Sequence, residues 1–191
     1  MGAVAVLLIP ATSHAHLVTT GLGPFYDGVE HFALTPEDLV PVVALALLAG
    51  LQDSCAGRLT LFVLPGAWFA GGFAGLWFPI VSNATALPTV SFLVLGGLVA
   101  ADLRLRPASM AGLAAVVGLA HGYMNGSAMS QASLGALGLL GIATTIFVAV
   151  ALAAALVVAL RAEWARIAVR VAGSWIAAVG LLLLGWSLRA A

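Results

Sequence analysis

Six long apolar stretches, separated by short polar segments, dominate the hydrophobic pattern of the chain. Each is close to the length of about 20 residues that a helix needs to cross a bilayer core ~30 Å thick. Because the connecting segments are short, consecutive stretches should form antiparallel neighbours. The predicted spans cover residues 36–52, 59–80, 87–103, 108–125, 134–160 and 167–188. This pattern predicts an all-α integral membrane bundle of about six transmembrane helices, forming a single domain over residues 16–191.

The first 15 residues form a shorter apolar segment of a different kind. The run from Met1 to Ile9 is too short to span a bilayer, and Ser13-His14-Ala15 places small residues where a signal peptidase cleaves. The segment lacks the basic residues of a typical leader, and its alternative interpretation is a hydrophobic start to an ordinary helix. We expect residues 1–15 to be a cleaved signal peptide, which would make His16 the new N-terminus.

The composition supports a lipid-facing surface and excludes several other classes of protein. Only 7% of the residues are charged and 63% are hydrophobic, whereas a soluble domain carries charge on about 25% of its residues. The single cysteine, Cys55, permits neither an intrachain disulfide nor a thiolate cluster for a metal. A net charge of zero argues against nucleic acid as a partner. The lipid bilayer is therefore the first expected partner.

The arginines indicate an orientation in the membrane. All seven basic residues are arginines, and six of them fall between spans one and two, three and four, or five and six: Arg58, Arg104, Arg106, Arg161, Arg166 and Arg170. Basic residues are enriched in cytoplasmic loops. We therefore expect these three loops in the cytoplasm, both mature termini outside, and the protein in the inner (plasma) membrane.

Glycines recur at the spacing of packed membrane helices. Gly71 and Gly75 form one such pair, and Gly118, Gly122 and Gly126 form a run of three in the fourth span. Small residues four apart allow helix backbones to approach closely in lipid. The fourth span should therefore lie inside the bundle.

Polar residues that are costly in a membrane gather before and at the start of the first span. If residues 25–34 are helical, Asp27 and His31 share a face at i and i+4, with Glu30 beside them. Such a pair can form half of a divalent-metal site, or the carboxylate can simply orient the imidazole. Pro36 should break this segment from the first span, because proline removes a backbone donor.

The first turn of the span after that break is also acidic. Thr35 is placed to act as its N-cap, followed by Glu37 and Asp38. These two carboxylates can stabilise the helix by complementing the positive charge of its N-terminal end, or they can serve as metal ligands.

A second polar pair lies within the fourth span. His121 and Asn125 are again at i and i+4, and they should face the bundle interior toward the first span. An interhelical hydrogen bond is the alternative role for this histidine. With the first segment, the pair would give nitrogen and oxygen ligands for nickel, cobalt, zinc or copper(II). The candidate ligands are His31, His121, Asp27, Asn125, Glu30, Asp38 and His16.

At these residues the sequence resembles the HupE/UreJ family of small membrane proteins. The similarity lies in the segments 14–16, 25–31 and 121–126 and extends over most of the chain. It implies transport of nickel or cobalt toward hydrogenase and urease maturation. Better-known members carry His-Pro, Gly-x-Asp-His and His-Gly-x-x-His-Gly motifs. This chain departs from all three motifs: Gly23-Pro24 stands near the place of His-Pro, Glu30 replaces the Asp before the histidine, and Asn125 replaces the second histidine of the last motif. These differences indicate a divergent branch with a different metal preference or a weaker site.

Three functions remain open from the sequence. The first is a secondary permease, since no phosphate-binding Gly-Lys motif is present. The second is an outer-facing metal-binding or assembly accessory that hands metal to a partner and transports nothing. A second copy of the chain or a metalloenzyme-maturation protein is the further partner expected. The third, an intramembrane hydrolase that uses a bound metal, is disfavoured because no His-Glu-x-x-His motif occurs and no Ser or Cys stands next to a plausible base. We therefore expect no enzyme and no prosthetic group, with the metal ion as substrate.

Overall fold

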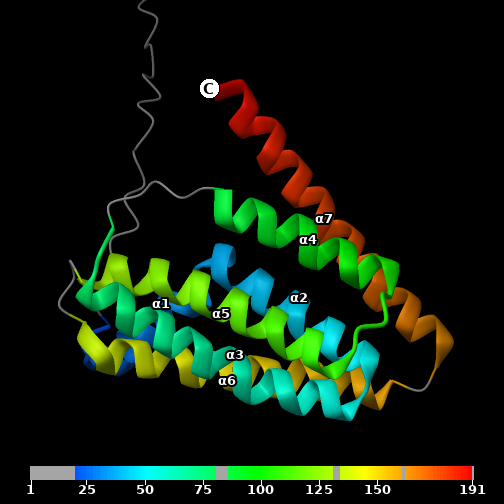
Figure 1. Ribbon diagram of the computed structural model, residues 1–191, viewed down its shortest axis with the longest axis horizontal. Coiled ribbons are helices and arrows are strands. Elements are labelled where there is room, and N and C mark those ends of the chain that lie inside the picture. The colour runs from blue at the N-terminus through cyan, green and yellow to red at the C-terminus, as the bar shows by residue number, and fades with distance from the viewer. Residues whose placement is uncertain (1–19, 81–85, 131–133, 161, 191) are drawn as a thin grey trace, which may run out of the picture.

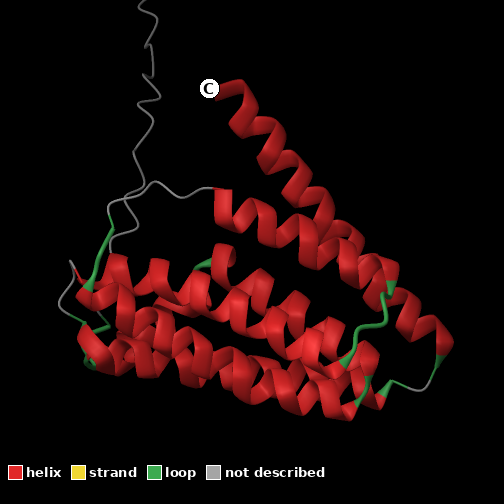
Figure 2. Ribbon diagram, viewed as in Figure 1, coloured by secondary structure: helices red, strands yellow, loops and turns green. Residues whose placement is uncertain are grey.

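The computed structural model describes residues 20–80, 86–130, 134–160 and 162–190, and every regular element in these ranges is a helix (Figure 2). The predicted leader, with His14 and His16, lies outside the described residues. The helices are α1 (Pro24–Leu34), α2 (Pro36–Gln52), α3 (Ser54–Trp77), α4 (Ala86–Ala101), α5 (Pro107–Ser130), α6 (Gly135–Ala159) and α7 (Glu163–Ala190). A helix therefore occupies each of the predicted spans, and α1 precedes them.

Three helices, α3, α6 and α7, are individually long and apolar enough to cross a membrane. The pair α1 and α2 passes the same test together and is bent by 75°, so the predicted break at Pro36 is confirmed. Helix α4 is apolar but shorter, with 16 residues. Helix α5 has sufficient length, but its Gly, Ser, His and Asn residues lower its mean hydropathy. The structure thus departs from a uniform set of six spans at the bent pair α1–α2, at the short helix α4 and at the more polar helix α5.

Helix α2 is the centre of the bundle and contacts each of the other helices among the described elements. Helix α3 packs along α5 on one side of it, α6 packs against α1, α2 and α3, and α4 packs against α2 and α7. Figure 1 shows α4 and α7 side by side along one flank, with the C-terminal end of α7 projecting beyond the other helices. Most side chains of α7 are exposed and apolar, as lipid-facing positions should be.

Glycine permits the closest helix contacts. A Cβ atom added at Gly122 or Gly126 of α5 would overlap the backbone carbonyl of Trp68 or Gly72 of α3. On the facing helix, a Cβ added at Gly71 or Gly75 would likewise overlap the backbone of α5. The prediction that these glycines allow close packing is confirmed.

The segments that carry the predicted loop arginines meet at one end of the bundle. Arg104 and Arg106 lie in the loop after α4, whereas Arg58 lies near the start of α3 and Arg166 and Arg170 near the start of α7. Arg166 Nη2 donates to the Leu51 carbonyl (3.2 Å) and forms an ion pair with Asp102 Oδ2 (3.3 Å). Gln52 joins the end of α2 to the loop after α4, through the Leu103 carbonyl and the Leu105 amide. These contacts agree with the prediction that the loops share one side; that this side is cytoplasmic stays a prediction.

Candidate functional site: a buried Asp–His–Asn–Ser cluster

The break between α1 and α2 places an acidic side chain inside the bundle. Thr35 occupies the N-cap position of α2, as predicted. Its hydroxyl makes no capping hydrogen bond to α2 and donates instead to the His31 carbonyl (2.6 Å). Asp38, in the first turn of α2, is only 6% exposed, whereas its neighbour Glu37 is exposed. Because the bend directs this turn against α5, Asp38 binds other side chains rather than serving only the helix end.

Helix α5 brings the matching groups to the same place. His121 is 1% exposed and Asn125 is 6% exposed, and both face α2 as predicted. The glycines beside them let α3 approach, so that the Trp68 ring stacks on the His121 ring with centroids 5.4 Å apart. The imidazole is therefore held by a rigid, fully buried indole.

Hydrogen bonds join four side chains from three helices. Asp38 Oδ1 lies 2.9 Å from His121 Nδ1, and Asp38 Oδ2 accepts from Asn125 Nδ2 at 2.8 Å. The other imidazole nitrogen, Nε2, lies 2.9 Å from the hydroxyl of Ser91 on α4. A neutral imidazole that donates from Nδ1 to the carboxylate accepts the Ser91 proton at Nε2. Both carboxylate oxygens and both ring nitrogens are thus engaged.

His31 of α1 borders this cluster. Its imidazole interacts electrostatically with Asp38 and with the side chain of Asn125. Asn125 Oδ1 is buried and makes no hydrogen bond of standard geometry with any described residue. An unpaired buried acceptor costs about 1–3 kcal/mol, so this oxygen is a group to which a cation could bind favourably.

The cluster lies far from the arginine-bearing end. Leu51, which contacts Arg166, is about 20 Å beyond Asp38 along α2, at ~1.5 Å per residue. His121 lies a similar distance from the start of α5 at Pro107. In a hydrocarbon core ~30 Å thick, the cluster therefore lies nearer to the opposite surface.

The remaining predicted ligands are not joined to this cluster by the contacts of the described residues. Asp27 shares a helix with His31, as predicted, but its Oδ1 accepts from the amide and the hydroxyl of Thr20, both at 2.6 Å. The turn before α1, with Gly21 and Gly23 at positive φ, folds Thr20 back onto this carboxylate. Glu30 has one buried carboxylate oxygen, which makes no hydrogen bond with any of the described residues. Across the described ranges, no group of three or more His, Cys, Asp or Glu side chains is assembled for a metal.

Sequence reasoning missed Ser91 and Trp68. Both stand as single residues in apolar spans, and no local spacing connects them to His121. The expectation that no Ser stands next to a plausible base is wrong in space, because Ser91, His121 and Asp38 are linked in series. A hydrolase also needs donors for an oxyanion. Ser91 lies within α4, where backbone amides are used by the helix itself.

The comparisons with known proteins agree with the resemblance drawn from the motifs. A family profile described as HupE / UreJ protein matches residues 4–183, nearly the whole chain. Searches of curated proteins and of solved structures find no match. The apolar helices and the matching family fit a multi-pass membrane protein. The chain belongs to the HupE/UreJ family.

Proposed function

We propose that the protein is a secondary permease for a divalent transition-metal ion, with nickel and cobalt as the first candidates. The observation that carries the proposal is a carboxylate, an imidazole and an unsatisfied amide oxygen buried together within a membrane bundle. Ionisable residues inside membrane proteins are costly and mark substrate or ion pathways. The family is associated with nickel or cobalt uptake, or with metalloenzyme maturation, which supports the choice of ions.

The donor types suit such an ion. Imidazole nitrogens from His31 and His121 combine with the oxygens of Asp38 and Asn125, a mixture that borderline divalent ions accept. Without a thiolate, the site would bind with moderate strength, as suits an ion that must leave again. The broken α1–α2 segment beside it resembles the interrupted helices on which many transporters build their sites.

The described arrangement is a closed one that an ion would have to open. His121 can bind a metal through Nε2 only when the Ser91 hydroxyl moves away from it. Asp38 can stay on Nδ1 and orient the ring, as carboxylates do behind many metal-bound histidines. The amide oxygen of Asn125 makes no hydrogen bond of standard geometry with a described residue, so an ion would compete there only with the neighbouring His31 imidazole, itself a candidate ligand. We further propose that the site opens toward the outside, on the side opposite the arginines.

Reconstitution of the purified full-length protein tests this function. We expect saturable binding of nickel or cobalt, together with metal accumulation inside proteoliposomes that protein-free liposomes lack. Binding without accumulation under any applied proton or ion gradient would contradict the permease and favour the accessory protein. Absence of both binding and accumulation for nickel, cobalt, zinc and copper would contradict both functions.

A further inference from the structure

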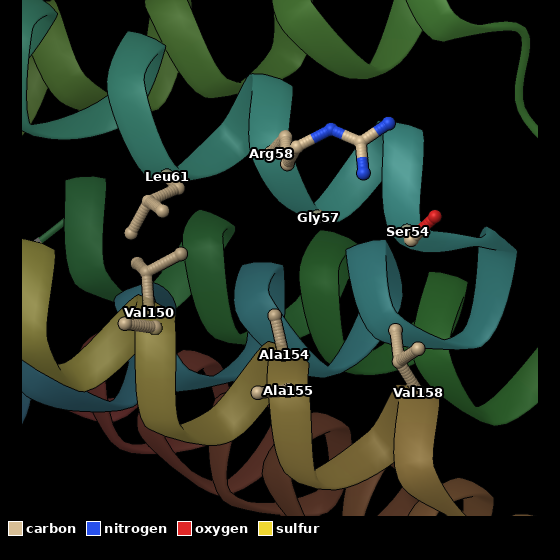
Figure 3. A pocket seen from close by; sticks show the side chains of 9 residues that line it. Ser54, Gly57, Arg58, Leu61, Val150, Ala154, Ala155 and Val158 are labelled. Atoms are coloured by element: carbon tan, nitrogen blue, oxygen red, sulfur yellow. The ribbon is translucent and has the colours of Figure 1, made fainter.

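A groove away from the buried cluster runs between α3 and α6 (Figure 3). It has a volume of ≈ 230 Å³, and its walls are almost entirely apolar. Leu61 and Val150 approach each other across it at one end, while Ala154 and Val158 line the α6 side toward the other end (Figure 3). The groove is open because small side chains face each other there: a Cβ at Gly57 would lie 3.7 Å from the Ala154 methyl group.

One charged side chain lies at the groove. Arg58 is exposed and extends along α3 toward Ser54, the end of the helix nearest the arginine-rich loops (Figure 3). Its guanidinium makes no ion pair or hydrogen bond with any residue in the described ranges. Asp53 is the nearest acidic residue to Arg58 in the sequence. Its carboxylate accepts a hydrogen bond from the Ala56 amide and caps α3. Among the described residues, a cationic side chain without an ionic partner thus lies beside the apolar groove.

The length of the groove matches one leaflet of a bilayer. From Val150 to Val158 it follows α6 for about 12 Å, compared with about 15 Å for half of the hydrocarbon core. Beyond its inner end, Phe62 of α3 contacts Phe147 of α6, with ring centroids 5.8 Å apart. A second hollow on the same seam, beyond this aromatic pair, is lined by Pro65, Phe69 and Leu140 and has no charged lining residue.

We propose that the groove beside Arg58 binds an anionic phospholipid. One acyl chain lies between α3 and α6, and the lipid phosphate accepts hydrogen bonds from the Arg58 guanidinium at the membrane surface. The charge selects an anionic headgroup, because a basic side chain near an anionic surface contributes about 1 kcal/mol. This inference does not depend on the metal site.

Native mass spectrometry of the full-length protein, with phosphatidylglycerol and phosphatidylcholine of identical chains, tests the proposal. We expect one retained lipid with about fivefold preference for phosphatidylglycerol, and loss of that preference in Arg58→Gln. Arg104→Gln, which removes an exposed arginine at the same end of the bundle, should keep it. Excess inorganic phosphate should not displace the lipid, because the acyl chain holds it.

Variants that fill the groove complete the test. Ala154→Phe, or the milder Ala155→Leu, should reduce binding of both lipids while the protein remains monodisperse and helical. Equal retention of both lipids by the parent protein would overturn the proposal, as would equal loss of preference in Arg58→Gln and Arg104→Gln. A dimer that the filled variants abolish would show that a second copy, not a lipid, occupies the groove.

Discussion

At the scale of single residues, the carboxylate of Asp38 organises the buried cluster. One oxygen fixes the His121 ring through Nδ1, and the other fixes the Asn125 amide through Nδ2. Because Asn125 donates to Asp38 through Nδ2, its carbonyl oxygen makes no hydrogen bond of standard geometry with a described residue, and the His31 imidazole interacts with the same side chain. The same carboxylate also acts on His31. This one side chain thus acts directly on His121, Asn125 and His31, whereas Ser91 is linked to it only through His121.

Asp38→Asn should reduce metal affinity by about 10–100-fold, the usual effect of losing a partner behind a metal ligand. An amide presents a donor where the carboxylate offered two acceptors, so one of its neighbours loses its bond. Equilibrium dialysis with nickel and cobalt measures the change. Glu37→Gln is the matched control, because Glu37 is adjacent but exposed, and it should bind nearly as the parent does. Equal effects in the two variants would show that only charge near the helix end matters.

Ser91→Ala should raise metal affinity by up to about fivefold. The variant removes the hydroxyl that occupies His121 Nε2, and one hydrogen bond contributes about 1 kcal/mol net. The same dialysis measurement, with Ser174→Ala as a control on the exposed face of α7, reports the change. Tenfold loss of affinity would instead make Ser91 a ligand, contrary to the closed arrangement described above.

The sequence was sufficient to predict the α5 half of this cluster and to name Asp38 among the candidate ligands, but not to single Asp38 out or to find Ser91. His121 and Asn125 stand out as polar groups in an apolar helix, and the cost of exposing them to lipid places them inside. The pairing of Asp38 with His121 depends on the angle at Pro36, and that of Ser91 on the position of α4. Neither is encoded by local spacing. For the same reason Asp27 appeared equivalent to Asp38, although the turn at Gly21 and Gly23 directs Thr20 onto it.

At the scale of elements, the contact between α3 and α5 determines the environment of His121. The glycines of α5 let the Trp68 backbone of α3 lie directly against α5, and this places the Trp68 indole on the His121 imidazole. The glycine spacing predicted close packing, and the structure confirms it. The spacing did not identify α3 as the partner, because Gly71 and Gly75 and the α5 glycines offer equivalent surfaces to several helices.

Gly122→Ala should destabilise the protein by about 1–3 kcal/mol, the usual cost of overpacking a well-packed interior. The added methyl group meets the Trp68 carbonyl, which belongs to a helix backbone and cannot move alone. Gly112→Ala is a matched control on the same helix, because a Cβ there meets nothing within 4 Å. It should be neutral or stabilising by about 0.5–1 kcal/mol. Thermal unfolding in detergent compares the two, and equal midpoints would contradict the close α3–α5 contact.

At the scale of the whole molecule, the native cysteine can test the orientation. Cys55 is exposed near the start of α3, at the end of the bundle that carries the arginines. A membrane-impermeant maleimide should therefore label Cys55 in inverted vesicles. The extent of labelling should be at least about tenfold lower in intact cells. Leu22→Cys in a Cys55→Ser background should show the reverse pattern, because Leu22 is exposed before α1. Labelling of Cys55 from outside would overturn the predicted topology.

The most direct test of the account is radiometal uptake by proteoliposomes containing the parent protein, His31→Ala or His121→Ala, for nickel, cobalt, zinc and copper in parallel. Stability is spread over many apolar contacts, so both variants should insert and remain folded at parent levels. Because the two imidazoles provide the nitrogen ligands of the cluster, each variant should lose at least about 90% of uptake of the transported ion. Parent-like uptake of every metal by both variants would contradict the claim that this cluster carries the ion.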